Sequence, residues 1–143
     1  MTNKKSILDF LKKNELCVLA TASKTGKPEA AVMVYLIKDD FSILVSTETW
    51  TRKYENIAKN SQVSIVVGGF KNDPTVQIDG LIEELAGERE DQAKKSIFSI
   101  HPEWKSYFQS PKSRFFKIRP LWLRYSDFSL QPPEIIQIED FKA

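Results

Sequence analysis

Short runs of apolar residues, separated by turn signals, are the feature that most limits the fold of this chain. In the clearest run, TVQIDGLIEEL at 75–85, Val76, Ile78 and Ile82 lie on one face and polar residues on the other, as in a strand with one buried face. Further runs have the composition of strands, at 16–22, 30–37, 41–46, 63–67 and 115–125. Six strands with only short helices between them predict a mainly β fold, a closed and largely antiparallel barrel.

Helices and bends are predicted at defined places. Helices are expected at 6–13 with Ser6 as cap, from Thr51 to about residue 60, and from 88 to about 100. Gly80 interrupts its strand, which indicates a bulge or a barrel bend, and Pro120 restricts the strand at 115–125 to an edge or a bulged position. No repeat or linker divides the 143 residues, so we expect a single domain over 1–143.

Composition excludes several classes of protein. Lys and Arg number 21 against 19 Asp and Glu, and the net charge of +2 is too small for a protein that binds polyanions over its surface. The single Cys17 excludes an intrachain disulfide and a multi-cysteine metal site. The N-terminal MTNKKSILDFLKKN carries charges where a signal peptide needs an apolar core, and no run is long enough to span a bilayer. We therefore expect a cytoplasmic protein with no membrane association.

Two adjacent cations, Arg52 and Lys53, open the helix that follows Thr51. They stand at the positive end of the helix dipole, where cations are unfavourable unless something negative offsets them. The first turn of a helix also has unpaired backbone N–H groups, and three hydroxyls lie nearby, on Thr47, Thr49 and Thr51. Hydroxyls, N–H groups and cations together predict a site for phosphate or another small anion. The alternative is an exposed helix start whose cations pair with Glu48 and Glu55, which would add little stability.

Two strands carry further candidate binding residues. Gln77 lies on the polar face of its strand, and its amide can both donate to and accept from the edge of a heterocycle. Trp122 and Arg124 share one face of a late strand, where they would form an aromatic wall with a cation beside it. The alternatives are a surface glutamine, and a tryptophan and an arginine that serve packing or an interface.

The common catalytic constellations are missing. His101 is the only histidine and precedes Pro102, so it is a poor candidate for a triad or a multi-histidine metal site, and we expect no metal site. Neither the Asp39, Asp40 pair in a turn nor the Glu83, Glu84 pair on opposite strand faces forms a persuasive carboxylate dyad. There is no phosphate-binding glycine motif. An enzyme with this sequence would need a bound cofactor for its reactivity.

The order of these elements resembles the pyridoxamine 5′-phosphate oxidase-like flavoproteins, the FMN-binding split barrels. The resemblance covers nearly the whole chain. It is carried by the hairpin CVLATASKTGKPEAAVMVYLI, the strand and helix FSILVSTETWTRKYENIAKN, the glycine-bent strand VQIDGLIEEL and the late strand FFKIRPLWLRY. It implies a six-stranded antiparallel split barrel that binds FMN.

The resemblance also implies a set of cofactor-binding residues. The FMN phosphate would be held by Thr51, Arg52 and Lys53. The isoalloxazine ring and ribityl chain would be lined by Met33, Val34, Tyr35, Ser46 and Thr47. Gln77 would meet the polar edge of the flavin. In this family two subunits normally share each flavin, so a homodimer is implied in which Trp122 and Arg124 reach the partner's cofactor.

The sequence departs from the family in two places. Members that oxidise pyridoxamine phosphate have a longer C-terminal section with Arg and His residues for the substrate phosphate, whereas this sequence ends in QPPEIIQIEDFKA, so vitamin B6 oxidation is not expected. Ala30 and Ala31 stand where many relatives have an Arg that contributes to phosphate binding. The short form is more similar to the general-stress-protein branch of the family.

Four functions remain open from the sequence. The first is a dimeric FMN-dependent oxidoreductase that takes a hydride from a small reductant or a nicotinamide. The second is a non-catalytic flavin store or redox sensor. The third is a relative that uses a deazaflavin or haem, although His101 is the only imidazole available as a haem ligand. The fourth is a barrel that binds single-stranded nucleic acid through Trp50 and Trp122, against which the small net charge argues, so no nucleic-acid partner is expected.

Overall fold

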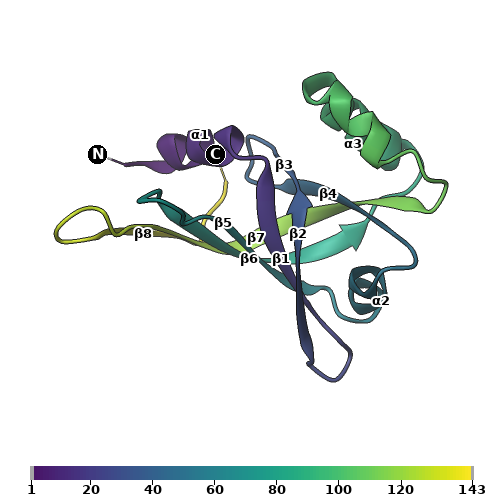
Figure 1. Cartoon of the computed structure of the whole chain (residues 1–143), viewed down its shortest axis with the longest axis horizontal. Helices are drawn as coiled ribbons and strands as arrows, with labels where there is room; N and C mark the ends of the chain where they lie inside the picture. The colour runs from purple at the N-terminus through teal and green to yellow at the C-terminus, as the bar shows by residue number, and fades with distance from the viewer. Residues whose placement is uncertain (1, 143) are drawn as a thin grey trace.

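Strands dominate the computed structural model, which describes residues 2–142. The strands are β1 (Leu16–Ala22), β2 (Pro28–Val34), β3 (Leu36–Ile37), β4 (Ile43–Glu48), β5 (Gln62–Gly68), β6 (Thr75–Glu84), β7 (Ser113–Asp127) and β8 (Glu134–Ile138). The helices are α1 (Lys4–Lys13), α2 (Arg52–Lys59), α3 (Glu88–Ile100) and the 3₁₀-helix η1 (Pro102–Tyr107). All three expected helices and all six expected strand regions are therefore present (Figure 1).

The strands form one curled antiparallel sheet that nearly closes on itself. Its order is β2-β1-β5-β6-β7-β4-β3, and β8 pairs with β7 outside this path. The two ends of the order, β2 and β3, are separated in the chain only by Tyr35, whose N–H donates to the carbonyl of Glu15 at 3.0 Å. One stretch of chain thus pairs with β1 through its first part and with β4 through its last, which closes a split barrel.

The strand count differs from the prediction in two details. The sheet has eight strands, because the expected strand at 30–37 is divided at Tyr35 and because β8 had not been predicted. When β2 and β3 are taken as one strand, the barrel itself has the six predicted strands. One helix boundary also differs: α1 begins at Lys4 with Asn3 as its cap, and Ser6 completes the capping box with Asn3.

The two longest strands bend where Gly80 lies opposite Pro120. The pairing of β6 with β7 shifts register between Asp79 and Gly80, as the glycine predicted. A Cβ at Gly80 would lie 2.6 Å from the carbonyl oxygen of Arg119, so only glycine fits this close approach. Pro120 tolerates the position because of the bulge, although β7 lies between β6 and β4 and is not an edge strand.

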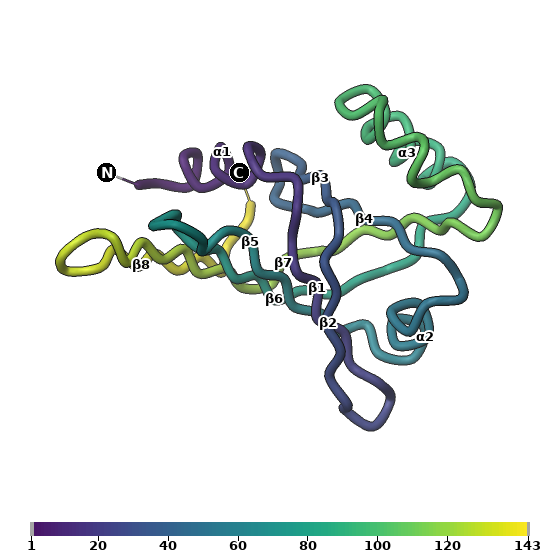
Figure 2. The backbone as a smooth tube through the Cα atoms, in the orientation of Figure 1, coloured from purple at the N-terminus to yellow at the C-terminus, as the bar shows by residue number. Residues whose placement is uncertain are grey.

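Two apolar clusters stabilise the fold. The first fills the barrel, where α1 covers one end with the fully buried Ile7 and Leu11. The second lies outside the barrel, where α3 and η1 pack Ile97 and Trp104 against Phe115 of β7. The helices thus occupy separate places around the sheet, and the trace in Figure 2 shows α2 beside the hairpin of β1 and β2. Parts of the outer face of the sheet are left uncovered by any helix.

Candidate functional site

The end of β4 and the start of α2 form a small polar site built on Thr51. The Thr51 hydroxyl accepts a hydrogen bond from the backbone N–H of Tyr54 at 3.2 Å, which confirms the predicted helix cap. The same oxygen lies 3.0 Å from the hydroxyl of Thr47, which is buried at the end of β4. Ser46 is also buried, and its hydroxyl donates to the carbonyl of Arg114 at 2.8 Å. The cap therefore ties the helix start to the preceding strand.

Lys53 and two backbone N–H groups at the start of α2 have no recorded partners among the described residues. Within residues 2–142, no hydrogen bond is recorded for the backbone N–H of Arg52 or Lys53, and the Lys53 ammonium has no ion pair. Lys53 is half-buried, and desolvation by this burial lowers its pKa. The first turn of α2 thus combines a partly desolvated lysine with N–H donors that have no recorded partner, and an anion bound there would stabilise both.

Arg52 has an internal carboxylate partner that the sequence did not reveal. Its Nη1 lies 2.5 Å from Oε2 of Glu29 on β2. The Glu29 carboxylate is only 12% exposed, and its other oxygen accepts from the Asn56 amide at 2.9 Å. The same amide donates to Thr21 at 3.0 Å, so β1, β2 and α2 all fix this carboxylate. A negative group therefore offsets one of the two cations within the chain itself.

The alternative partners considered from the sequence have other contacts. Glu55 forms an ion pair with Lys59 at 3.6 Å, one helical turn later. Glu48 accepts a hydrogen bond from the indole N–H of Trp50. Neither carboxylate is recorded in an ion pair with Arg52 or Lys53 among the residues that the structure describes. The simple pairing of these cations with Glu48 and Glu55 is thus not what the structure shows.

Met33, Val34 and Tyr35 lie at the junction of β2 and β3. The side chains of Met33 and Tyr35 belong to the barrel interior, and Val34 packs against the outer cluster beneath α3. The Tyr35 hydroxyl donates to the carbonyl of Leu11 at 2.6 Å, and burial raises its pKa above the ordinary value. Tyr35 therefore contacts α1 with its side chain, and any contact of this residue with a ligand would use the backbone.

Gln77, Trp122 and Arg124 form a second polar group on the outer face of β6 and β7. Gln77 and Arg124 are cross-strand partners, and the Arg124 guanidinium lies 5.1 Å from the centre of the Trp122 ring. Arg124 Nη2 donates to Gln137 of β8 at 3.1 Å. Its Nε is buried and has no hydrogen-bond partner within residues 2–142, so one donor of the guanidinium is unsatisfied in the single chain.

The two polar groups lie at different positions along β7. Ser46, beside the Thr51 site, pairs with Phe115 of β7, whereas Gln77 pairs with Arg124 of the same strand. Phe115 and Arg124 are nine positions apart on β7, roughly 30 Å measured along the strand, which bends opposite Gly80. No recorded contact joins the two groups among the described residues, so the predicted site residues do not form one pocket within a subunit.

An apolar strip lies beside the second group on the outer face. The strand register places Val32, Val18 and Val66 in one row with Gln77 and Arg124. The exposed fractions are 67% for Val32, 41% for Val18 and 39% for Val66. Adjacent exposed valines on three strands are typical of a contact surface.

The fold and the polar site at the start of α2 define a split-barrel protein. Comparison with known proteins identifies its family. Residues 4–127 match the family described as pyridoxamine 5′-phosphate oxidase. The chain belongs to this family, as the resemblance of its motifs indicated. A comparison with functionally curated proteins found no match.

Solved structures of similar fold have several described activities. A pyridoxamine 5′-phosphate oxidase-related, FMN-binding protein from Nostoc punctiforme has a TM-score of 0.73 at 12% identity, covering 96% of this chain and 92% of its own. General Stress Protein 26 from Bacillus anthracis has a TM-score of 0.69 at 22% identity, covering 94% and 98%. A haem-binding protein from Mycobacterium smegmatis has a TM-score of 0.73 at 16% identity, covering 88% of this chain but only 53% of its own. At these identities the likeness shows the fold, and this chain spans about half the length of the mycobacterial protein.

The helices give one further finding. Among residues 2–142, none of the helices combines the length and the apolar character needed to cross a bilayer.

Proposed function

We propose that this chain binds FMN, with the phosphate at the start of α2, and acts as an FMN-dependent oxidoreductase on a small molecule that remains to be identified. The observation that carries the proposal is the half-buried Lys53 in the first turn of the Thr51-capped helix, whose leading N–H groups have no recorded partner among the described residues. Membership of the family and an FMN-binding protein of the same fold support the choice of anion.

The residues at the start of α2 fit a phosphate group in charge and in donors. Lys53 would supply a cation, and the backbone N–H groups of Arg52 and Lys53 would supply directed hydrogen bonds. The Thr47 and Thr51 hydroxyls are close enough to each other for one to turn toward a bound oxygen. Arg52 would contribute less than the family resemblance implies, because its guanidinium already faces Glu29.

The chain's own residues would bind and orient the cofactor. Bound FMN would supply hydride transfer, and a small reductant or a nicotinamide is the proposed donor. Ser46 and Thr47 would contact the ribityl chain near the phosphate, and the backbone of Met33, Val34 and Tyr35 would line the ring. Gln77 would donate to and accept from the polar edge of the ring, and Arg124 beside Trp122 would place positive charge near it.

A homodimer would bring the two polar groups to the same cofactor. Within one subunit no recorded contact joins them among the described residues, and their positions on β7 lie roughly 30 Å apart measured along the strand. We propose that a second copy covers the Val32, Val18 and Val66 strip, so that Trp122 and Arg124 of one subunit reach the flavin held by α2 of the other. The unpaired Nε of Arg124 and the exposed valines support this arrangement.

The absorption spectrum of the purified protein tests the proposal, together with chromatographic identification of any molecule released by heat. Flavin bands and released FMN would support it, and reduction of the bound flavin by a nicotinamide would favour an oxidoreductase over a flavin store or redox sensor. A haem or deazaflavin spectrum would assign the chain to another ligand class. A colourless protein that also fails to take up added FMN would refute the proposal.

A further inference from the structure

The only histidine of the chain lies at a rigid junction between two helices. His101 follows the last residue of α3 and precedes the first residue of η1. Its backbone N–H donates to the carbonyl of Ile97 at 2.8 Å, and its backbone carbonyl accepts from the backbone N–H of Trp104 at 3.0 Å. The imidazole stacks on the buried Trp104 indole with a centroid distance of 3.8 Å and an angle of 8°. Both the backbone and the ring of His101 are therefore held in place.

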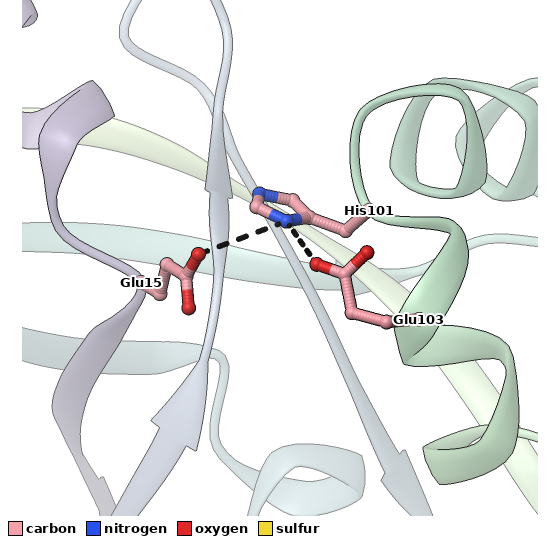
Figure 3. A group of neighbouring side chains, drawn as sticks. All are labelled: Glu15, His101 and Glu103. Atoms are coloured by element: carbon pink, nitrogen blue, oxygen red, sulfur yellow. Dashed lines mark hydrogen bonds and ion pairs between the residues drawn. The ribbon is translucent and has the colours of Figure 1, made fainter.

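Two carboxylates approach the same ring nitrogen from different parts of the chain. Oε1 of Glu103, on η1, lies 2.9 Å from Nδ1 of His101. Oε1 of Glu15, immediately before β1, lies 3.9 Å from that nitrogen. Figure 3 shows the two carboxylates on opposite sides of the imidazole edge, both directed toward Nδ1. Three potential metal-ligating atoms thus converge on one point.

The spacing of these atoms is close to that of a zinc coordination sphere. All three lie within 4.8 Å of one another. Zn–N and Zn–O bonds near 2.1 Å in a tetrahedral site place ligand atoms about 3.4 Å apart. The two Glu side chains are 58% and 60% exposed, so small rotations of the carboxylates bring them to this distance around the fixed imidazole.

The cluster also carries more negative charge than its protein partners offset. Among the described residues, neither Glu15 nor Glu103 has an ion pair with a Lys or Arg, and the only side chain recorded in contact with either carboxylate is His101. One imidazole carries at most a single positive charge, which leaves one of the two carboxylates uncompensated. A divalent cation would balance the negative charge of the two carboxylates and would be coordinated by the lone pair of Nδ1.

From this geometry we infer that Glu15, His101 and Glu103 bind a divalent transition metal ion such as Zn²⁺. His101 would ligate through Nδ1, with its proton on Nε2, and each glutamate would supply one oxygen. Water would complete the coordination, since three protein ligands leave a position open. His101 also lines a cavity of about 180 Å³ with Asn14 and Tyr35, which gives a small molecule access to the metal. The ion would tie the start of β1 to the junction of α3 and η1.

Calorimetric titration of the untagged, EDTA-dialysed chain with ZnCl₂ tests this inference. We expect one zinc ion per chain with Kd of about 10 μM or tighter. The variants His101→Phe, Glu15→Gln and Glu103→Gln should each bind at least about tenfold more weakly. Phenylalanine keeps an aromatic ring on Trp104 and removes the ligand nitrogen. Glu90→Gln, a carboxylate of α3 paired with Lys94, is the matched control and should bind as the unaltered chain does.

A second measurement does not depend on the folding of any variant. Because the chain has one histidine, its imidazole ¹⁵N resonances report on a single residue. Added zinc should shift the Nδ1 resonance to that of a coordinated nitrogen and leave Nε2 protonated. The inference is overturned if the chain takes up no zinc, if His101→Phe binds zinc equally well, or if bound zinc leaves the imidazole resonances unmoved.

Discussion

Glu29 on β2 forms an ion pair with Arg52, the first residue of α2, at 2.5 Å. The carboxylate is largely buried and is also held by Asn56, so it is a fixed part of the site. It pairs with an arginine that the family resemblance assigns to the FMN phosphate. In this chain the phosphate and Glu29 would therefore compete for Arg52, and Lys53 becomes the main cation of the proposed site.

Removal of the Glu29 charge should strengthen FMN binding. In Glu29→Gln the amide oxygen can still accept from Asn56, while Arg52 is released and repulsion of the phosphate is removed. We expect about tenfold tighter FMN binding, equal to about 1.4 kcal/mol, in a fluorescence titration. Glu55→Gln, which removes an exposed carboxylate of α2 that pairs only with Lys59, is the control and should change the affinity much less. Unchanged or weaker binding by Glu29→Gln would contradict the competition.

The valine strip should control the oligomeric state. We expect the native chain to be a dimer by light scattering and Val18→Glu to be a monomer, because a charge would be buried without a partner. The monomer should also bind FMN more weakly, since it lacks the partner's Trp122 and Arg124. Phe70→Glu is the control, because Phe70 is exposed on the turn between β5 and β6, away from the strip. A native monomer, or a dimeric Val18→Glu variant, would refute the proposed interface.

The bend of β6 should be intolerant of any side chain at Gly80. An alanine Cβ would lie 2.6 Å from the Arg119 carbonyl oxygen and 2.8 Å from a methyl carbon of Ile118. Because the first contact is with backbone, we expect Gly80→Ala to lower the free energy of unfolding by about 3 kcal/mol in urea denaturation. Gly87→Ala meets no atom within 4 Å, so its loss of about 1–2 kcal/mol comes only from backbone strain at φ 62° and ψ −132° and should be smaller. Equal losses of unfolding free energy in the two variants would show that the close approach to Arg119 does not determine the cost of a side chain at Gly80.

Cys17 should be chemically inert in the folded protein. The thiol is 2% exposed on β1, and burial raises its pKa to about 12. The reactive thiolate is therefore scarce at neutral pH and shielded from reagents. We expect no reaction with a disulfide reagent in native buffer and one rapid equivalent in denaturant. Rapid labelling of the native protein with its circular dichroism unchanged would contradict this burial.

The main elements of the fold follow from local sequence patterns. The alternation in β6 predicted which of its side chains are buried, because a period of two is a property of any strand with one buried face. Gly80 predicted the bulge and Thr51 predicted the cap of α2, since each residue type favours its position for a local reason. These predictions needed no knowledge of distant contacts.

The missed features all depend on contacts between residues far apart in the sequence. Glu29 had no local signal as the partner of Arg52, because the closed barrel and α2 bring them together. β8 follows Pro132 and Pro133 in a segment without clear alternation, and pairing with β7 makes it a strand. Likewise, the cluster of Glu15, His101 and Glu103 could not be inferred from spacing, so the sequence predicted no metal site there.

The most direct test of the central proposal is a comparison of FMN with riboflavin, which differs only in the absence of the phosphate. The native chain should bind FMN at least about tenfold more tightly, because charge-assisted hydrogen bonds contribute about 1.5–3 kcal/mol. In Arg52→Ala with Lys53→Ala this preference should disappear, whereas Lys59→Ala at the other end of α2 should retain it. Equal affinity of the native chain for the two flavins, or a preference that survives loss of both cations, would contradict a phosphate site at the start of α2.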